Sequence, residues 1–232
     1  MKNRNLFTYL PGPGPILGIL LQTSPPAPSE GRLERGLGAI SATEELSKEH
    51  ALLFRLLIAM ENLADKAARD PNIDLTPIRK AAVIIKGVVA DHHMTFEEEH
   101  IYPKFERTPQ AGQLRDLART LRDQHDKARR VNSRIIDLAS SNRRSVDQIN
   151  ELRRLIYDET EMFRAHVAWE ESVLFTAMYA ALTRDTIRDI NTRMIEEERR
   201  FFGRNGLEKF FHDLAEIERS AGTHDLSRFP FR

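Results

Sequence analysis

The sequence predicts an all-α protein: an up-down-up-down four-helix bundle with extra C-terminal helices and an irregular N-terminal tail. Three observations predict this fold. Apolar residues recur at helical spacing in four long stretches between residues 41 and 183. Short polar or proline-containing breaks separate these stretches, and no alternating strand pattern competes with them. Helices of this length with short connections favour antiparallel packing in a bundle.

The composition limits the chemistry that the chain can carry. The 35 basic and 35 acidic residues leave a net formal charge of zero, so no electrostatic argument points to nucleic acid or to an acidic membrane surface. The chain has no cysteine, which excludes disulfides, cysteine zinc sites, iron–sulfur clusters and thiol catalysis. No stretch approaches the ~20 apolar residues of a membrane span. Any metal must therefore be held by nitrogen and oxygen ligands.

Residues 1–40 form a tail of different composition. Leu10–Pro15 and Ser24–Ser29 are rich in proline and cannot continue a helix. The short apolar run Ile16–Leu21 lies between them, behind two basic residues. Two interpretations are open: a degenerate export signal, or an irregular tail that packs loosely on the bundle. We expect a cytoplasmic protein, with export to the periplasm as the alternative.

The first two helices have recognisable ends. Ser41–Glu44 forms a capping-box pattern that predicts the start of the first helix, which ends near Asp70–Asn72. We expect Thr76 to be the N-cap of the second helix, with Pro77 at its first helical position. The apolar spacing then continues to Phe105.

The third and fourth helices follow the same logic. Thr108–Pro109 restarts the chain, and the third helix runs to Leu138. Ser140–Ser145 is a polar break, and a second capping box at Ser145–Gln148 predicts the fourth helix, which ends near Leu182.

The remaining residues predict an extension. Residues 184–220 show two shorter helical patterns, separated by Gly203–Gly206. Residues 223–232 are expected to cover one side of the bundle. The predicted division of the chain is therefore a tail (1–40), a four-helix bundle (41–183) and a C-terminal helical extension packing on the bundle (184–232).

Six residues in the bundle have the character of metal ligands. His93 and Glu97 are four residues apart, so the imidazole and the carboxylate extend from one face of a helix. The same spacing recurs at His166 and Glu170. Single histidines lie in the middle of the two other long helices, at His50 and at His125.

Counting along the helices places these histidines at one level of the bundle. His50 precedes the break at Asn72 by 22 residues, and His93 follows it by 21. Across the next break, at Thr108, the counts for His93 and His125 are 15 and 17. At about 1.5 Å per residue these pairs are level within half a turn. The count across the third break differs by about one turn.

Four imidazoles and two carboxylates predict a pair of first-row metals. They are too many ligands for one tetrahedral zinc, and too many nitrogens for magnesium or calcium. The predicted ligands are His50 and His93 for one metal, His125 and His166 for the other, and Glu97 and Glu170 as bridges, although the pairing could be permuted. No separate acid–base dyad predicts catalytic residues.

These motifs resemble the hemerythrin-like (HHE cation-binding) family over about residues 44–179. His93–Pro103 resembles the family's H-x-x-x-E-E-x-x-x-F-P block, and His166–Phe175 resembles its second copy. Leu46–His50 and Leu121–His125 resemble the two single-histidine helices. Gly203–Phe229 is similar to an extension found on some bacterial members.

The resemblance implies a non-haem di-iron centre with two iron ions, bridged by an oxo or hydroxo group. It also implies that the centre binds O2, NO or peroxide for sensing, storage or detoxification. Oxygen-carrying members have a fifth histidine where this chain has Arg129, and a longer-spaced aspartate where it has Glu170. The chain is thus of the H–HxxxE–H–HxxxE type, and reversible oxygen carriage is not expected.

Other polar residues near the motifs leave alternatives open. His100 is either an extra ligand or ligand-supporting residue, or a partly exposed residue near the helix end. His92 is rotated off the ligand face and is not expected to be a ligand. Glu98, Glu99 and Glu171 are expected to support the ligands or to be solvated.

Two other functions fit the same residues. One is a di-iron enzyme that decomposes peroxide or NO, or that donates iron for repair. The other is a metal-free helical interaction module. The sequence predicts no partner beyond a small-molecule ligand and leaves the oligomeric state open.

Overall fold

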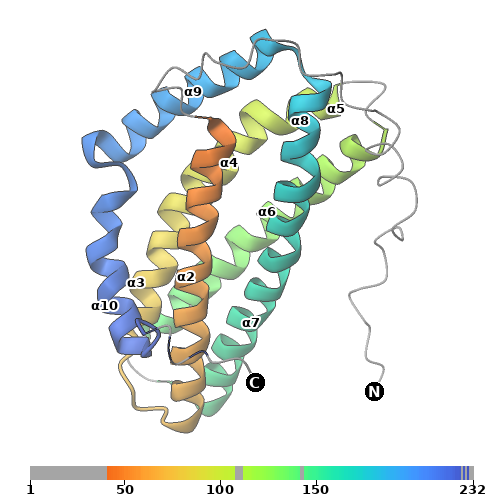
Figure 1. Cartoon of the computed structure of the whole chain (residues 1–232). Helices are drawn as coiled ribbons and strands as arrows, with labels where there is room; N and C mark the ends of the chain where they lie inside the picture. Colours follow the sequence, from red (N-terminus) through yellow and green to blue (C-terminus); the bar gives the residue numbers. More distant parts are fainter. Residues whose placement is uncertain (1–40, 108–111, 142–143, 226, 228, 230–232) are drawn as a thin grey trace, which may run out of the picture. The chain divides into compact units, whose positions relative to one another are not determined.

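A computed structural model of the chain describes residues 41–107, 112–141, 144–225, 227 and 229. Every regular element in these ranges is helical, which confirms the predicted all-α class (Figure 1). The predicted tail and the predicted helix start at Thr108–Pro109 lie outside the described residues. The elements are α2 (Ala42–Arg69), α3 (Thr76–Ile84), η1 (Ile85–His93), α4 (Met94–Phe96), η2 (Glu97–Ile101), α5 (Tyr102–Glu106), α6 (Gly112–Ser140), α7 (Val146–Trp169), η4 (Glu170–Leu174), α8 (Phe175–Ala181), α9 (Arg184–Phe202), η5 (Gly203–Phe210) and α10 (Phe211–Ala221).

The helix starts follow local capping chemistry. Both predicted capping boxes are present, with Ser41 as the N-cap of α2 and Ser145 as the N-cap of α7. The predicted N-cap of α3 is wrong by one residue. Leu75 is the cap, because the Asp74 carboxylate accepts a hydrogen bond from the Thr76 amide at 2.8 Å and makes Thr76 the first helical residue.

Two of the long helices change their winding near the predicted ligands. Residues 76–106 form one continuous rod in which η1 and η2 are π-helical, and residues 146–181 form another that contains the π-helical η4. His93 ends η1, Glu97 begins η2 and Glu170 begins η4. Such wide turns concentrate at functional sites. The apolar periodicity of the sequence did not reveal them.

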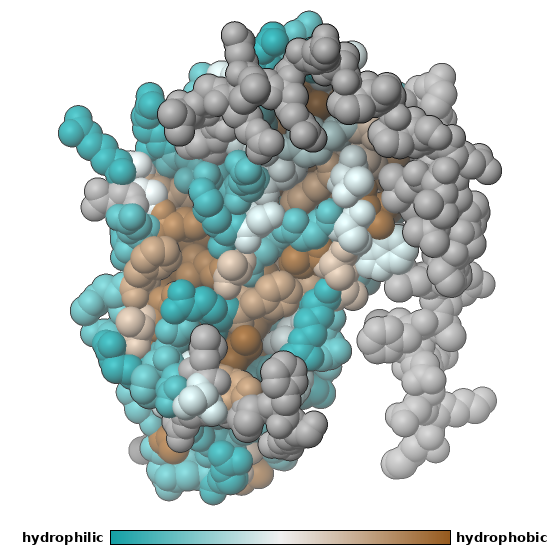
Figure 2. All heavy atoms as spheres, in the orientation of Figure 1, coloured by the Kyte–Doolittle hydropathy of each residue, from teal (hydrophilic) through white to brown (hydrophobic). Residues whose placement is uncertain are grey.

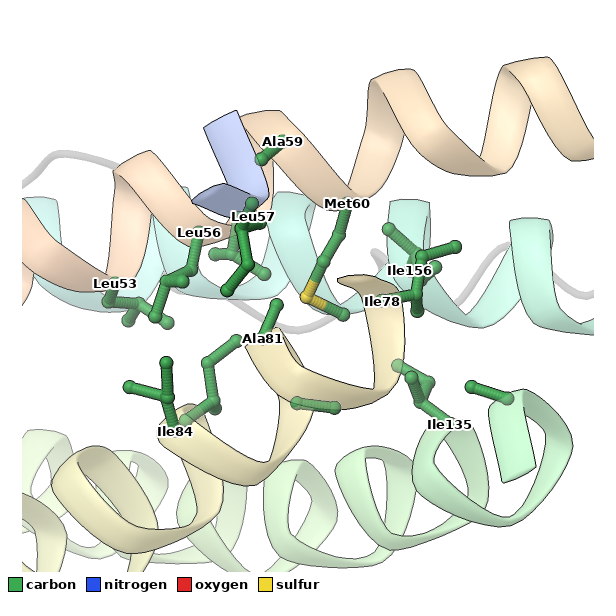
Figure 3. Packing of buried hydrophobic residues seen from close by; sticks show 14 of the residues in the cluster. Leu53, Leu56, Leu57, Ala59, Met60, Ile78, Ala81, Ile84, Ile135 and Ile156 are labelled. Carbon is green, nitrogen blue, oxygen red and sulfur yellow. The ribbon is translucent and has the colours of Figure 1, made fainter. Parts of the chain in front are cut away.

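The two rods and the helices α2 and α6 pack as a helical bundle. Helix α2 contacts α3 and α7, and α6 contacts the same two helices from the other side. Figure 3 shows Met60 of α2 lying among Ile78 of α3, Ile135 of α6 and Ile156 of α7. These four side chains are fully buried. Burial of each stabilises the fold by about 1.5–3 kcal/mol, so this apolar layer holds the four helices together.

The C-terminal helices pack against α2 and α3 (Figure 1). The predicted break at residues 203–206 contains two glycines with positive φ, 73° at Gly203 and 54° at Gly206, which side chains with a Cβ rarely adopt. Helix α10 contacts α2 and α3, and Arg55 of α2 binds Glu218 of α10 through two hydrogen bonds of 2.8 Å. Figure 2 shows hydrophobic residues among hydrophilic ones on the face where these helices meet. In the described residues, no helix is both long enough and apolar enough to cross a membrane.

Candidate metal centre

The structure brings all six predicted ligand residues together in the interior of the bundle. Each has an exposed fraction of 4% or less. They come from α2, the α3–α5 rod, α6 and the α7–α8 rod, so each of the four bundle helices contributes. The residues are His50, His93, Glu97, His125, His166 and Glu170.

Their donor atoms form two overlapping groups of four, and within each group all atoms lie within 4.8 Å of one another. Glu97 and Glu170 belong to both groups. The first group adds His50 and His93 to the two carboxylates, and the second adds His125 and His166.

Each shared carboxylate faces one histidine from each group. Glu97 Oε2 is 3.5 Å from His93 Nε2 and 3.5 Å from His125 Nε2. Glu170 Oε2 lies 3.4 Å from Nε2 of His50 and 3.2 Å from that of His166. First-row metals with bonds of about 2.0–2.2 Å separate neighbouring ligand atoms by roughly 3.0–3.6 Å. These spacings therefore fit a pair of such metals between the carboxylates.

Unsatisfied polar atoms support the same fit. Glu97 Oε1, Glu170 Oε2 and His50 Nε2 are buried and have no hydrogen-bond partner. A buried polar atom without a partner costs about 1–3 kcal/mol. Coordination to a cation would satisfy all three, and a nitrogen–oxygen donor set of this size suits iron-like metals better than calcium or magnesium.

Each of the four histidines is held by a second polar side chain at its outer nitrogen. The Nδ1–H group donates to a carboxylate or amide oxygen, which turns Nε2 toward the centre and selects its tautomer. The pairs are His50 with Glu171 (2.8 Å), His93 with Glu49 (2.7 Å), His125 with Glu98 (2.8 Å) and His166 with Gln124 (2.9 Å).

The sequence analysis expected Glu98 and Glu171 near the ligands but did not identify Glu49 or Gln124. A signal for both exists in the sequence, because each directly precedes a single histidine, His50 or His125. Their targets, however, lie on neighbouring helices. Only the packed bundle shows which imidazole each one reaches.

Tyr102 was also missed, although its hydroxyl lies inside the centre. It donates to Glu170 Oε1 at 2.5 Å, and it also lies 3.2 Å from Glu97 Oε2 and 3.2 Å from His125 Nε2. The sequence signal was the tyrosine that replaces phenylalanine in the H-x-x-x-E-E-x-x-x-F-P block. Burial and the charge of Glu170 raise the pKa of Tyr102 well above its usual range, so the phenol stays protonated and remains a donor.

The two shared carboxylates differ electrostatically. Burial and the neighbouring charge of Glu170 raise the pKa of Glu97 well above its ordinary value. Burial would also raise the pKa of Glu170, but the nearby His166 and His50 outweigh it and hold that pKa well below its ordinary value. Glu170 is therefore the ionised member of the pair.

The pKa values of the histidines also shift in opposite directions. Burial lowers the pKa of His50, but Glu170 and Glu171 more than compensate and raise it to about 9. The pKa of His93 is held well below its usual range by burial and by His50. Burial lowers the pKa of His125 to about 4 despite its bond to Glu98. Metal binding requires neutral imidazoles, so His50 must release a proton on loading.

Residues with open interpretations fall outside the two groups. His100 is in neither group; its side chain is 19% exposed and its ring packs edge-on against Phe96. His92 is also in neither group, although it is buried. Glu99 is solvated, with a side chain 64% exposed. Arg129, which replaces the fifth histidine of oxygen carriers, donates to Glu98 Oε1 at 2.8 Å.

Comparisons with known proteins agree with this arrangement. Residues 41–178 match the family described as the hemerythrin HHE cation binding domain. Proteins described as uncharacterized from Mycobacterium bovis and Mycobacterium tuberculosis are 31% identical to this chain over 211 residues, which is 89% of this chain and 81% of each relative. No solved structure matches the chain.

Proposed function

We propose a di-iron function for this chain, which belongs to the hemerythrin HHE cation-binding domain family. The family implies iron binding. The finer proposal is a non-haem di-iron protein that binds O2, NO or peroxide for sensing, storage or detoxification. The observation that carries it is the pair of overlapping donor groups that share Glu97 and Glu170.

In this proposal the four long helices form an up-down-up-down bundle (41–183), and residues 184–232 are an extension packed on it. His50 and His93 would hold one iron, and His125 and His166 the other. Glu97 and Glu170 would bridge them, because each faces one histidine of each group. Bound iron would supply redox chemistry and coordination positions open to a small molecule.

The surrounding residues prepare the centre for that task. The partners of the four Nδ1 atoms hold the imidazoles in place, so little reorganisation is needed when metal binds. Tyr102 presents a proton donor among the candidate ligands. The six candidate ligands are at most 4% exposed, so water has limited access to them. A small diatomic ligand or peroxide fits such an enclosed site better than a large substrate.

Metal analysis and optical spectroscopy test the proposal. Protein produced in iron-rich medium should contain two irons per chain, and its absorption spectrum should change on reduction with dithionite and again with NO. His93→Ala should lose iron, whereas His212→Ala should not, because His212 is on α10 with a side chain 80% exposed. A protein that stays empty after anaerobic reconstitution with iron would contradict the proposal and favour a metal-free interaction module.

Tyr102 favours a second candidate function, an enzyme that decomposes peroxide. Its hydroxyl is a buried donor that contacts both shared carboxylates, and peroxide breakdown needs a proton supplied at the centre. Steady turnover of peroxide by the iron-loaded protein, reduced in Tyr102→Phe and abolished in Glu170→Ala, would establish the enzyme. Consumption limited to one equivalent would leave a binding protein.

A further inference from the structure

A third group of donor atoms lies beside the dinuclear centre and is separate from both of its groups. It consists of Glu49 Oε1 on α2, His92 Nε2 on η1 and Glu198 Oε1 on α9. His92 Nε2 is 3.2 Å from each of the two carboxylate oxygens. We propose that these three residues bind a third divalent metal ion of the zinc type, in a mononuclear site of their own.

The geometry fits a metal better than it fits hydrogen bonds alone. His92 Nε2 is hydrogen-bonded to Glu198 Oε1, and its single N–H group cannot serve Glu49 Oε1 equally well. Glu49 Oε1 accordingly has no hydrogen-bond partner although its residue is only 1% exposed. Separations of 3.2 Å match the edges of a tetrahedron around zinc, roughly 3.3 Å for bonds near 2.0 Å. Imidazole nitrogen and carboxylate oxygen are both ordinary zinc ligands, and water could take the remaining position.

The charges of the cluster point the same way. Two carboxylates converge on one imidazole in a largely buried place, which concentrates negative charge there. Two carboxylates, a neutral imidazole and a divalent cation sum to zero.

The group of His125 and His166 has a neutral side chain where the group of His50 and His93 has Glu49. Gln124 occupies the position equivalent to Glu49, directly before a single histidine, and its neutral amide accepts the Nδ1–H of His166 at 2.9 Å. Ala165 precedes His166 where His92 precedes His93. The carboxylate and the additional imidazole thus occur together, and only in the half that α9 contacts through Glu198.

The surroundings make the site both rigid and accessible. The His92 ring lies 4.9 Å from the ring of Phe201 and 4.8 Å from that of Phe202, both on α9. Glu198 lines a surface cavity of about 560 Å³, and its side chain is 18% exposed. Zinc and its water ligand could therefore enter from the cavity without opening the bundle. A metal here would join α9 to α2 and η1.

Zinc binding to iron-loaded protein tests the proposal. After excess metal is removed, Zn²⁺ is titrated calorimetrically, and iron and zinc are counted in the same sample. The expected result is one zinc per chain with the iron content unchanged. Glu198→Gln should bind no zinc but retain iron, because Glu198 contacts none of the six candidate iron ligands and belongs to neither of their groups. Glu197→Gln is the matched control on α9 and should bind zinc normally.

Four outcomes decide whether this site exists apart from the dinuclear centre. No zinc uptake by the unaltered protein, or equal zinc uptake by the Glu198→Gln variant, would overturn the third site. Zinc uptake accompanied by an equal loss of iron would overturn it as well, because the zinc would then occupy the dinuclear centre. Zinc uptake that depends on Glu198 in a chain that takes up no iron would support the third site while contradicting the di-iron function.

Discussion

The two halves of the proposed dinuclear centre share one sequence pattern but differ in their electrostatic environment. In each half, the residue directly before the single histidine forms a hydrogen bond with the histidine of the HxxxE pair in the same half. The residue directly after the glutamate of that pair forms one with the single histidine of the other half. The first half is Glu49, His50, His93, Glu97 and Glu98; the second is Gln124, His125, His166, Glu170 and Glu171. The crossed bonds interlock the halves, so neither can form its part of the centre alone.

The two halves have different residues at three equivalent positions. Glu49 corresponds to Gln124, His92 to Ala165, and Tyr102 to Phe175. The first half therefore carries an additional buried carboxylate, imidazole and phenol. The second half instead contains the ionised carboxylate, Glu170, which faces two histidines. Ligand residues at equal spacing in the sequence thus differ in charge and in buried neighbours. Several substitutions can test how much this difference matters.

The largest expected effect distinguishes the two shared carboxylates. Glu170→Gln removes the ionised oxygen that faces His50 and His166, whereas Glu97→Gln removes a carboxyl whose pKa is already raised. We expect Glu170→Gln to weaken iron binding by more than about 100-fold, since even outer-shell changes cost about 10–100-fold. The loss in Glu97→Gln should be clearly smaller. Chelator competition measures both; equal losses would show that the two halves are equivalent.

The next effect concerns the positions seven residues before each HxxxE histidine. Lys86 is exposed and pairs with Asp91, whereas Glu159 is buried and both of its carboxylate oxygens lack a partner. Burial raises the pKa of Glu159 from 4.5 to about 8. Between these values the folded state holds a proton that the unfolded state has lost, so stability must fall as pH rises, at about 1.4 kcal/mol per pH unit.

Glu159→Gln should remove this slope and raise the free energy of unfolding by a few kcal/mol at pH 8, with little change at pH 4.5. Urea unfolding between pH 4.5 and 9 measures it. Glu161→Gln is the control, because that side chain is 58% exposed. A variant whose stability follows pH as the unaltered protein does would show that Glu159 is ionised in the fold.

Tyr102→Phe would make the first half resemble the second at this position. The shared carboxylates would lose their common donor, which should lower stability by about 1–3 kcal/mol because they are buried. Thermal unfolding of the chain before metal loading measures this loss. The mirror change, Phe175→Tyr, tests whether the asymmetry matters; equal stability of the two variants would indicate that the phenol is interchangeable between the halves.

The smallest effect is expected at Arg129. Its guanidinium binds Glu98, which holds His125, but the Arg129 side chain is 30% exposed and the pair is partly screened. Arg129→Met should cost about 0.2–1 kcal/mol of stability, with both irons retained. Iron analysis and thermal unfolding check it together. Loss of one iron would instead assign Arg129 a direct part in holding the second half.

Local sequence signals accounted for the helices and for the six donor residues. Capping boxes at Ser41 and Ser145 and four-residue His–Glu spacings depend only on contacts within one helix, so they can be read along the chain. Counting residues from the breaks placed the four histidines at one level, because the rise of a helix is constant. The start of α3 was wrong by one residue, since a side chain outside the helix decided it.

Tertiary structure decided the rest. The π-helical turns at His93, Glu97 and Glu170 aim ligands without altering the apolar pattern. The partners of the imidazoles, the reach of the Tyr102 hydroxyl and the approach of Glu198 to His92 all join different helices or distant turns. Such contacts depend on how whole helices rotate and pack, and no spacing within one helix encodes them. Residue spacing along the chain thus indicated which side chains carry metal-type donor atoms. The packing of the bundle brought these atoms together and set the charges around each of them.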